Sequence, residues 1–190
     1  MAARDAASRL ACAVVLLLVL AAASGLAQEM AVPTDLQFSL FYRILTYDRA
    51  LERRASGGLV IGVVYQGRFR ASALASEQAL RQAPSAPAGF QVRLVPLDLD
   101  SIDLGQAVEA SGCDVLYVTP LRAVGIRAVT AVSHAHGILT LTGVPAYVEA
   151  GLAVGIGLRG DRPEIVVNLD AVRAEGSDFS AQLLRLARVW

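Results

Sequence analysis

Apolar residues along the chain fall into two alternating spacings. Short apolar runs, continuous or alternating with polar positions, are typical of strands, and we predict strands at residues 59–65, 90–97, 114–119 and 138–142. Between them, apolar residues recur at helical spacing. A first helix is predicted to begin with Asp35 as its cap and to carry apolar residues as far as Leu51, and further helices are predicted at residues 71–83, 103–110 and 121–134.

This order of strands and helices predicts the α/β fold class. Strands that alternate with helices form a parallel sheet through right-handed crossovers, with helices on both faces. After residue 142 the pattern changes, because two strands at 152–158 and 164–169 flank the turn-forming residues 159–163 and predict an antiparallel hairpin. A last helix is predicted at residues 180–190, with Leu183, Leu184, Leu186 and Ala187 packing inward. We expect a single domain with a mostly parallel sheet and a C-terminal antiparallel hairpin.

The first 27 residues have the order of a secretory signal peptide. Arg4 and Arg9 precede an uncharged apolar run at residues 10–23, and small residues lead to Ala27. The alternative is a retained membrane anchor, but the run is shorter than the roughly 20 residues that span a bilayer as a helix. We therefore expect cleavage after Ala27, a domain at residues 28–190 that does not span the membrane, and export from the cytoplasm.

Composition excludes several classes of function. The chain has 17 arginines, no lysine and 17 acidic residues, so its net charge is zero and a nucleic-acid partner is not expected. Without lysine there is no Walker phosphate loop and no Schiff-base chemistry. Cys113 is the one thiol of the expected domain, so it has no internal disulfide. We interpret Cys113 as a small buried residue; if it is exposed it can join two chains, which leaves a homodimer open.

Other candidate motifs have simpler structural interpretations. Gly155, Gly157 and Gly160 match the spacing of a dinucleotide-binding loop, but a strand rather than a helix follows, so we predict a hairpin turn. His134 and His136 do not share a helix face and lack metal-ligand neighbours in sequence. The acidic residues Asp98, Asp100 and Asp103 fit a turn and a helix cap, and no Gly-x-Ser-x-Gly elbow is present. We expect no enzymatic activity, no metal and no cofactor.

The predicted topology indicates where a binding site would lie. Ligands of parallel α/β sheets bind beyond the carboxyl ends of the strands. The candidate rim residues there are Tyr65, Gln66, Thr119, Thr142 and Tyr147. None is charged, so the rim suits a neutral ligand or a hydrophobic patch on a partner better than an anion.

The C-terminal stretch carries a resemblance to a known family. Residues 166–171 (VVNLDA), Glu175-Gly176 and residues 179–187 (FSAQLLRLA) resemble the closing motif of the YfiR/HmsC-like family of periplasmic regulators. The helix that carries residues 41–45 (FYRIL) is also similar to the family's opening. We interpret the motif as mainly structural: Asp170 caps a helical turn, and Gly176 permits a left-handed backbone. Its residues Asn168, Leu169, Gly176, Leu183 and Leu184 belong to packing.

The resemblance implies both a fold and a function. It implies a small α/β domain similar to one lobe of a periplasmic binding protein. It also implies a non-catalytic periplasmic regulator that docks on the periplasmic part of an inner-membrane signalling protein, either a diguanylate cyclase of cyclic di-GMP signalling or a sensor kinase. The alternative function is a small-molecule sensor or carrier lobe related to solute-binding proteins.

Overall fold

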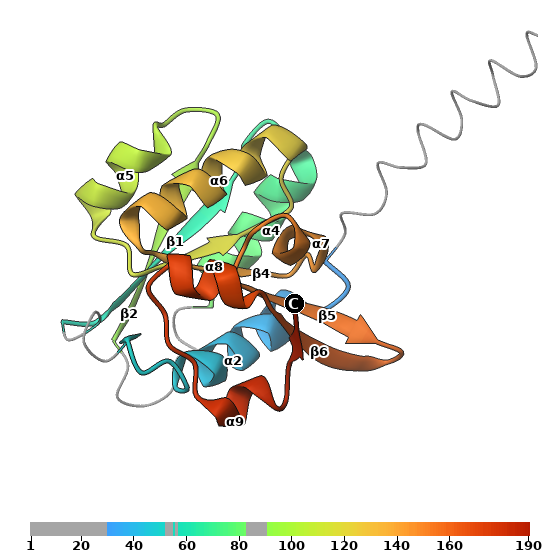
Figure 1. The fold of residues 1–190 in the computed structure, drawn as a ribbon. Coiled ribbons are helices and arrows are strands. Elements are labelled where there is room, and N and C mark those ends of the chain that lie inside the picture. The colour runs from blue at the N-terminus through green and yellow to red at the C-terminus, as the bar shows by residue number, and fades with distance from the viewer. Residues whose placement is uncertain (1–29, 52–54, 56, 83–90) are drawn as a thin grey trace, which may run out of the picture.

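The computed structural model describes residues 30–51, 55, 57–82 and 91–190 (Figure 1). The predicted signal peptide lies outside these residues. Seven strands form one sheet in the order β2-β1-β3-β4-β5-β6-β7. The strands are β1 Leu59–Tyr65, β2 Val92–Asp98, β3 Val115–Val118, β4 Leu139–Thr142, β5 Val154–Arg159, β6 Arg162–Val167 and β7 Arg188–Val189.

The sheet has the predicted mixed topology. Strands β2, β1, β3, β4 and β5 are parallel to one another, whereas β6 pairs antiparallel with β5. The last strand, β7, lies parallel to β6 at the edge of the sheet. The α/β class, the mostly parallel sheet and the C-terminal hairpin are thus confirmed.

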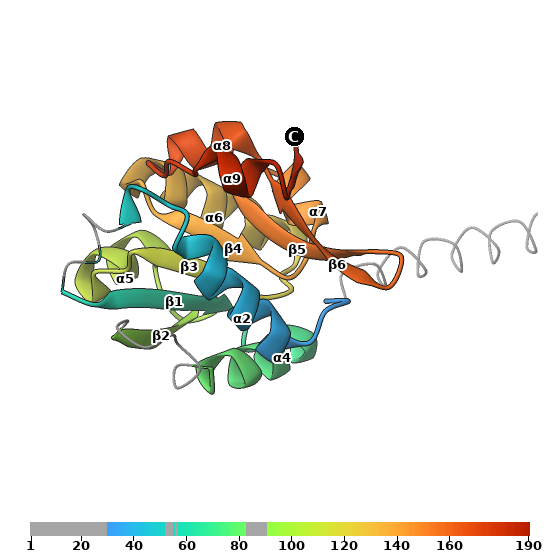
Figure 2. The same cartoon turned by 90° about the horizontal axis from the view of Figure 1, so that it is seen from below.

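Helices cover both faces of the sheet (Figures 1 and 2). The helices are α2 Thr34–Leu45, α4 Arg70–Leu80, α5 Leu104–Ser111, α6 Ala123–His136, α7 Ala146–Glu149, α8 Leu169–Ala174 and α9 Ala181–Leu184. On one face, α2 packs beside α4. On the other face lie α5 and α6. The buried apolar residues accordingly form two clusters, one under each layer, and the continuously apolar strand β3 contributes to both.

A buried polar bridge ties α2 to the middle of the sheet. Gln37 on the inner face of α2 has no exposed surface; its Nε2 donates to Val32 O at 2.6 Å, and its Oε1 accepts from the Tyr117 hydroxyl at 2.9 Å. Gly143, which follows β4, lies against the same amide, because a Cβ at that position would meet Gln37 Cδ at 2.6 Å. The close approach therefore requires glycine at position 143.

Buried phenols predict a loss of stability at high pH. Burial raises the pKa of Tyr42 from 10.0 to about 12, and it also raises the pKa of Tyr117. The folded protein therefore holds these protons more tightly than the unfolded chain, so their stabilisation is full below pH 10, and the contribution of Tyr42 is lost as pH rises through 12. We expect the free energy of unfolding, measured by urea denaturation, to fall between pH 9.5 and 11.5. In Tyr117→Phe the decline should be shallower, and an equal decline would contradict this assignment.

Helix α2 differs from the prediction at both ends. Pro33 occupies the N-cap position without a side-chain cap, so the predicted cap at Asp35 is wrong; Asp35 lies in the first turn, where its charge favours the helix dipole. The helix was predicted to carry apolar residues as far as Leu51 but ends at Leu45. The chain then turns through Tyr47 and Asp48, whose N–H groups donate to Ile44 O and Leu45 O.

The predicted C-terminal helix is wrong over most of its length. Helix α9 is a single turn, and Arg188–Val189 joins the sheet beside Val166 and Val167. Leu183 is buried as predicted, whereas Leu186 is 66% exposed rather than packed inward. The reason is that the backbone groups along one edge of β6 need hydrogen-bond partners, and residues 188–189 provide them by adopting an extended conformation.

The glycine-rich segment forms the predicted hairpin turn. Arg159 and Arg162 pair at the end of the hairpin, and Gly160 has a φ of 59°, which glycine adopts without strain. Among the residues described here, no helix is both long and apolar enough to cross a lipid bilayer.

Candidate functional site

The predicted rim residues lie at the carboxyl edge of the sheet, and most are held by internal hydrogen bonds. The Tyr147 hydroxyl accepts from Leu121 N and donates to Leu121 O, both at 2.8 Å. The Thr142 hydroxyl donates to Val118 O at 2.9 Å. Both side chains are buried; Thr142 joins β4 to β3, and Tyr147 joins α7 to the segment that follows β3.

The other rim residues hold the neighbouring end of β1. The Thr119 hydroxyl is buried; it donates to Val64 O at 2.9 Å and contacts Ser72 Oγ at 2.8 Å. Gln66 accepts from Arg122 N at 2.8 Å. Tyr65 is half-buried, and its pKa is raised by burial and, to a lesser extent, by the charge of Asp98. The rim is therefore well ordered by its own contacts, and Tyr65 and Gln66 are its more accessible members.

The acidic residues beside this rim have the predicted turn and cap roles. Asp98 accepts from the N–H groups of Gly67 and Asp100, and Asp100 accepts from Arg68 N at 2.7 Å. Asp103 caps α5 by accepting from Gln106 N. Over the described part of the chain, no group of three or more His, Cys, Asp or Glu side chains is placed to hold a metal ion.

The histidines and the thiol also have local partners. His136 lies 3.6 Å from Glu109, and His134 lies 4.0 Å from Glu175, both at the C-terminal end of α6. Cys113 is buried, as predicted, and burial raises the pKa of its thiol, against a smaller lowering by the hydrogen bond with Ser111. A buried thiol with a raised pKa is a poor nucleophile.

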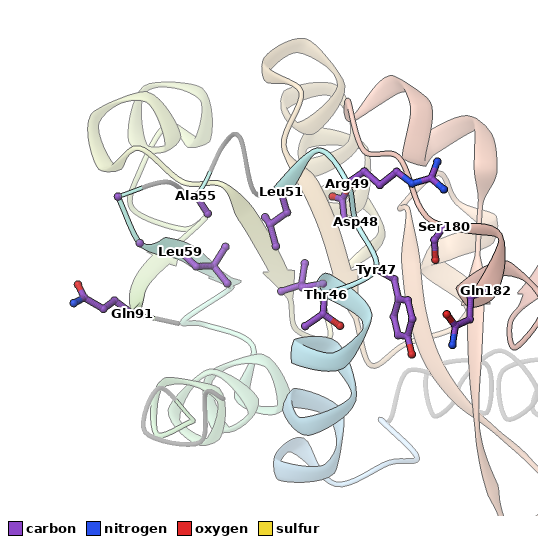
Figure 3. A pocket seen from close by; sticks show the side chains of 13 residues that line it. Thr46, Tyr47, Asp48, Arg49, Leu51, Ala55, Leu59, Gln91, Ser180 and Gln182 are labelled. Carbon is purple, nitrogen blue, oxygen red and sulfur yellow. The ribbon is translucent and has the colours of Figure 1, made fainter. Parts of the chain in front are cut away.

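A cavity of about 900 Å³ lies at the opposite, amino-terminal edge of the sheet (Figure 3). It is placed between the end of α2, the start of β1 and the segment that leads into α9. Its lining combines apolar, polar and charged residues, and the lining residues are Leu45, Thr46, Tyr47, Asp48, Arg49, Leu51, Ala55, Gly57, Gly58, Leu59, Gln91, Ser180 and Gln182. Its volume is in the usual range for small-molecule sites.

One wall of the cavity is a latch, by which we mean residues 47–49 together with residues 178–180. The two segments pair at an isolated bridge between Asp48 and Phe179. Arg49 N donates to Asp178 O and Ser180 N donates to Tyr47 O, both at 3.0 Å. The latch therefore fastens the end of α2 to the C-terminal part of the chain.

Asp48 is the central side chain of the latch. It is 3% exposed, and its Oδ1 accepts from Ala50 N at 2.9 Å and from Asp178 N at 3.0 Å. On the outside, Arg49 and Asp178 form an exposed ion pair at 3.6 Å. Sequence reasoning missed Asp48, because nothing in its local sequence separates it from an ordinary surface residue after a helix.

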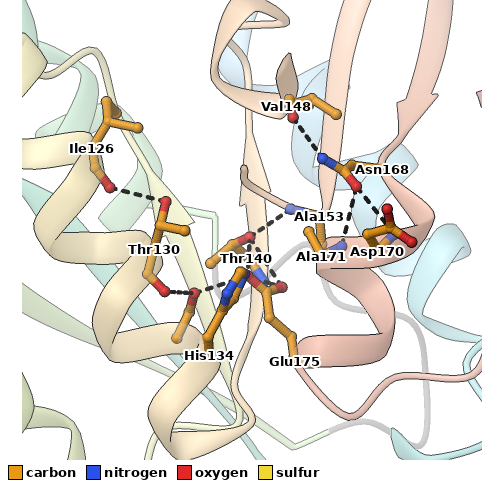
Figure 4. A network of polar contacts seen from close by, with 11 residues as sticks. Ile126, Thr130, His134, Thr140, Val148, Ala153, Asn168, Asp170, Ala171 and Glu175 are labelled. Atoms are coloured by element: carbon orange, nitrogen blue, oxygen red, sulfur yellow. Dashed lines mark hydrogen bonds and ion pairs between the residues drawn. The ribbon is translucent and has the colours of Figure 1, made fainter. Parts of the chain in front are cut away.

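A second buried carboxylate, Glu175, joins the closing motif to the sheet (Figure 4). Glu175 follows α8 and has no exposed surface. It accepts from Thr140 N at 2.7 Å, from the Thr140 hydroxyl at 2.8 Å and from the Ser133 hydroxyl at 2.9 Å. One carboxylate thus fixes the start of β4 and the end of α6 to the end of α8.

Asn168 gives the closing motif its second anchor. Its Oδ1 accepts from Asp170 N and Ala171 N at 3.1 Å, so Asn168 rather than the predicted Asp170 caps α8. Its Nδ2 donates to Val148 O at 3.0 Å, which holds the end of α7 (Figure 4).

The remaining motif residues also sit in packed or turn positions. Gly176 has a φ of 69°, in the left-handed region. Leu183 is buried, and Leu169 and Leu184 pack against the cluster under α2.

Solved structures define the class of fold. The chain is 18% identical to a conserved domain protein from Vibrio cholerae O1 biovar eltor (TM-score 0.61). The matched region covers 83% of this chain and 60% of that chain. It is 14% identical to the ABC domain in complex with L-Trp from Streptococcus pneumonia (TM-score 0.58), covering 83% and 62%. It is 19% identical to a ligand-free, open substrate-binding protein with adhesive properties from Clostridium difficile (TM-score 0.52), covering 74% and 57%. The chain spans about 60% of these longer proteins and has the fold of a lobe of periplasmic binding-protein type.

The sequence itself identifies the family. The family model YfiR/HmsC-like matches residues 34–188. The chain therefore belongs to the YfiR/HmsC-like family, as the closing motif predicted. A search of curated proteins gave no match.

Proposed function

We propose that this protein is a non-catalytic regulator of the periplasm that docks on the periplasmic part of an inner-membrane signalling protein, either a diguanylate cyclase or a sensor kinase. The observation that carries the proposal is the family match over residues 34–188, which covers the sheet and the closing motif. The export signal expected at residues 1–27 agrees with it. So does the placement of the histidines, acids and thiol in structural roles.

Exposed apolar residues near β7 support docking. Leu186 is 66% exposed and Trp190 is 55% exposed, while Arg188 lies over the Trp190 ring at 5.5 Å. Trp190 N donates to Val167 O, which fixes the residue beside the end of β6. Tryptophan and arginine are enriched among the residues that dominate binding energy at interfaces.

The test compares two forms of the chain in cells. The full chain and a variant that lacks residues 1–27 are produced in a host from which the gene is deleted, and cyclic di-GMP and kinase output are measured. We expect only the full chain to change signalling and to crosslink to a membrane protein that has a periplasmic segment. Trp190→Ala should reduce crosslinking, whereas Leu74→Ala, an exposed leucine on α4, should not. Equal output from both forms would contradict the proposal.

The cavity favours a second candidate function, a small-molecule sensor lobe. It brings apolar and polar side chains together around one hollow of about 900 Å³. Recognition of a ligand by this lobe would be measured on the purified protein without any partner.

A further inference from the structure

The last strand leaves one edge of the sheet open. Strand β7 is last in the strand order and has β6 as its one neighbour among the described strands, and the C-terminus lies beside β6 (Figure 1). Val189 pairs with Val167, and Trp190 N donates to Val167 O at 2.8 Å. In a parallel ladder a residue bonds to the positions on either side of its partner, so the N–H and C=O of Val189 point away from β6. One backbone donor and one acceptor therefore face outward from this edge.

The side chains around this edge are accessible. Leu186 is 66% exposed, Val189 is 42% exposed and Trp190 is 55% exposed. Successive side chains of a strand point to opposite faces, so Arg188 and Trp190 share one face of the sheet and Val189 lies on the other. Exposed apolar side chains beside outward-facing backbone groups are the arrangement to which an extended peptide adds as a strand.

The face that carries Trp190 has an excess of positive charge. Glu164 lies between two arginines: it forms an ion pair with Arg159, and its Oε2 lies 3.4 Å from Arg188 Nε. One carboxylate thus faces two guanidinium groups. Arg188 Nε makes no hydrogen bond with a described residue, so Glu164 leaves donors of this guanidinium available. This charge attracts a carboxylate and opposes a second copy of the chain, which would bring the same arginines to the edge.

We propose that an extended acidic segment of the membrane partner adds to β7 as a further strand, with its backbone bonded to Val189 and an acidic side chain beside Arg188 and Trp190. The inference rests on the proposed docking function and names the chemistry of the docking segment. A strand of two residues offers few hydrogen bonds, so the backbone alone gives little affinity. Trp190 and Arg188 supply most of it, because these side-chain types dominate binding energy at interfaces.

The test uses two probes that differ in charge. One is an acetylated and amidated heptapeptide in which valine and glutamate alternate, and the other has lysine in place of glutamate. Each is titrated into the isotope-labelled protein. We expect the glutamate peptide to shift the amide resonances of residues 164–167 and 186–190 and to slow hydrogen exchange at Val189, whereas the lysine peptide should leave both readouts unchanged. The inference is overturned if the glutamate peptide does not bind at millimolar concentration, if both peptides bind equally, or if the shifts map elsewhere.

Variants of Val189 separate strand addition from other contacts at this surface. Val189→Pro removes the outward N–H but no bond to β6, and proline is tolerated on an edge strand in this orientation. Its melting temperature should therefore stay close to that of Val189→Thr, which keeps the N–H. Relative to Val189→Thr, Val189→Pro should weaken binding of the glutamate peptide about tenfold, the contribution of one hydrogen bond. Trp190→Ala should weaken it about thirtyfold. Equal binding by the proline and threonine variants would overturn the inference.

Crosslinking to the membrane partner in cells is scored separately from peptide binding. If Trp190→Ala lost the crosslink while Val189→Pro kept it, the docking proposal would stand and strand addition would be wrong. The oligomeric state is measured by analytical ultracentrifugation. A dimer that Val189→Pro dissociates would show that the edge pairs with a second copy, and it would also overturn the inference.

Discussion

Replacement of Glu175 by alanine is expected to lower the free energy of unfolding by about 4 kcal/mol, the largest effect of a single substitution that we predict. The carboxylate accepts from Thr140 N, the Thr140 hydroxyl and the Ser133 hydroxyl, all in a fully buried site. Alanine would leave Thr140 N and the Thr140 hydroxyl in the interior without this acceptor, while the Ser133 hydroxyl would keep only its contact with Thr130 O. The measurement is urea denaturation followed by circular dichroism.

Two further variants make this experiment specific. Glu175→Gln keeps the shape but turns one acceptor into a donor that faces other donors, so it should lose much of the same stability. Glu77→Ala replaces an exposed glutamate on α4 and should change the free energy of unfolding by less than about 0.5 kcal/mol. If Glu175→Ala were as mild as Glu77→Ala, the network would not be a structural anchor.

Replacement of Gly143 by alanine is expected to cost about 3 kcal/mol. The added Cβ would overlap the amide of Gln37, which is fully buried and cannot move without breaking its hydrogen bonds with Val32 and Tyr117. Thermal denaturation should show a clear drop in melting temperature, together with a changed near-ultraviolet signal from Tyr117.

The control for this prediction is a glycine in open space. A Cβ at Gly57 would have no heavy atom within 4 Å, so Gly57→Ala should be close to neutral. A second test combines Gly143→Ala with Gln37→Ala, which removes the overlap. If the double variant were destabilised by the sum of the two single effects, the collision would not be the cause.

Much of the fold follows from local pattern, because the central strands β1, β3 and β4 are buried along most or all of their length. Residues 59–65 were predicted with the observed bounds, because a short, continuously apolar and β-branched run that follows glycines is typical of a buried strand. The helical spacing of apolar residues gave a wrong prediction at residues 180–190, because the end of this segment pairs with the unpaired edge of β6. Arg188 and Val189 form a strand because β6 lies beside them in the folded protein, and the local sequence gives no information about that neighbour.

The candidate site was less predictable than the fold. Topology directs attention to the carboxyl edge, whereas the cavity lies at the amino edge, because the chain leaves α2 at Leu45 and turns toward residues 178–180. The burial of Gln37 could have been predicted from the sequence, because Gln37 lies on the same helix face as the apolar Phe41 and Ile44. The buried positions of Asp48 and Glu175 could not have been predicted in this way, because Asp178 and Thr140, with which they form hydrogen bonds, are distant in sequence.

The hydrogen bond from Asp178 to Asp48 joins residues 130 positions apart. A ribosome that has delivered the first two-thirds of this protein has made α2 and three strands, but it has not yet made Asp178, whose N–H donates to Asp48. Closing so long a loop adds little to the equilibrium cost, because the cost grows only with the logarithm of length, but contacts of high sequence separation slow folding. The nascent polypeptide therefore reaches its native state only after synthesis is almost finished, and until then its apolar surfaces remain open to chaperones.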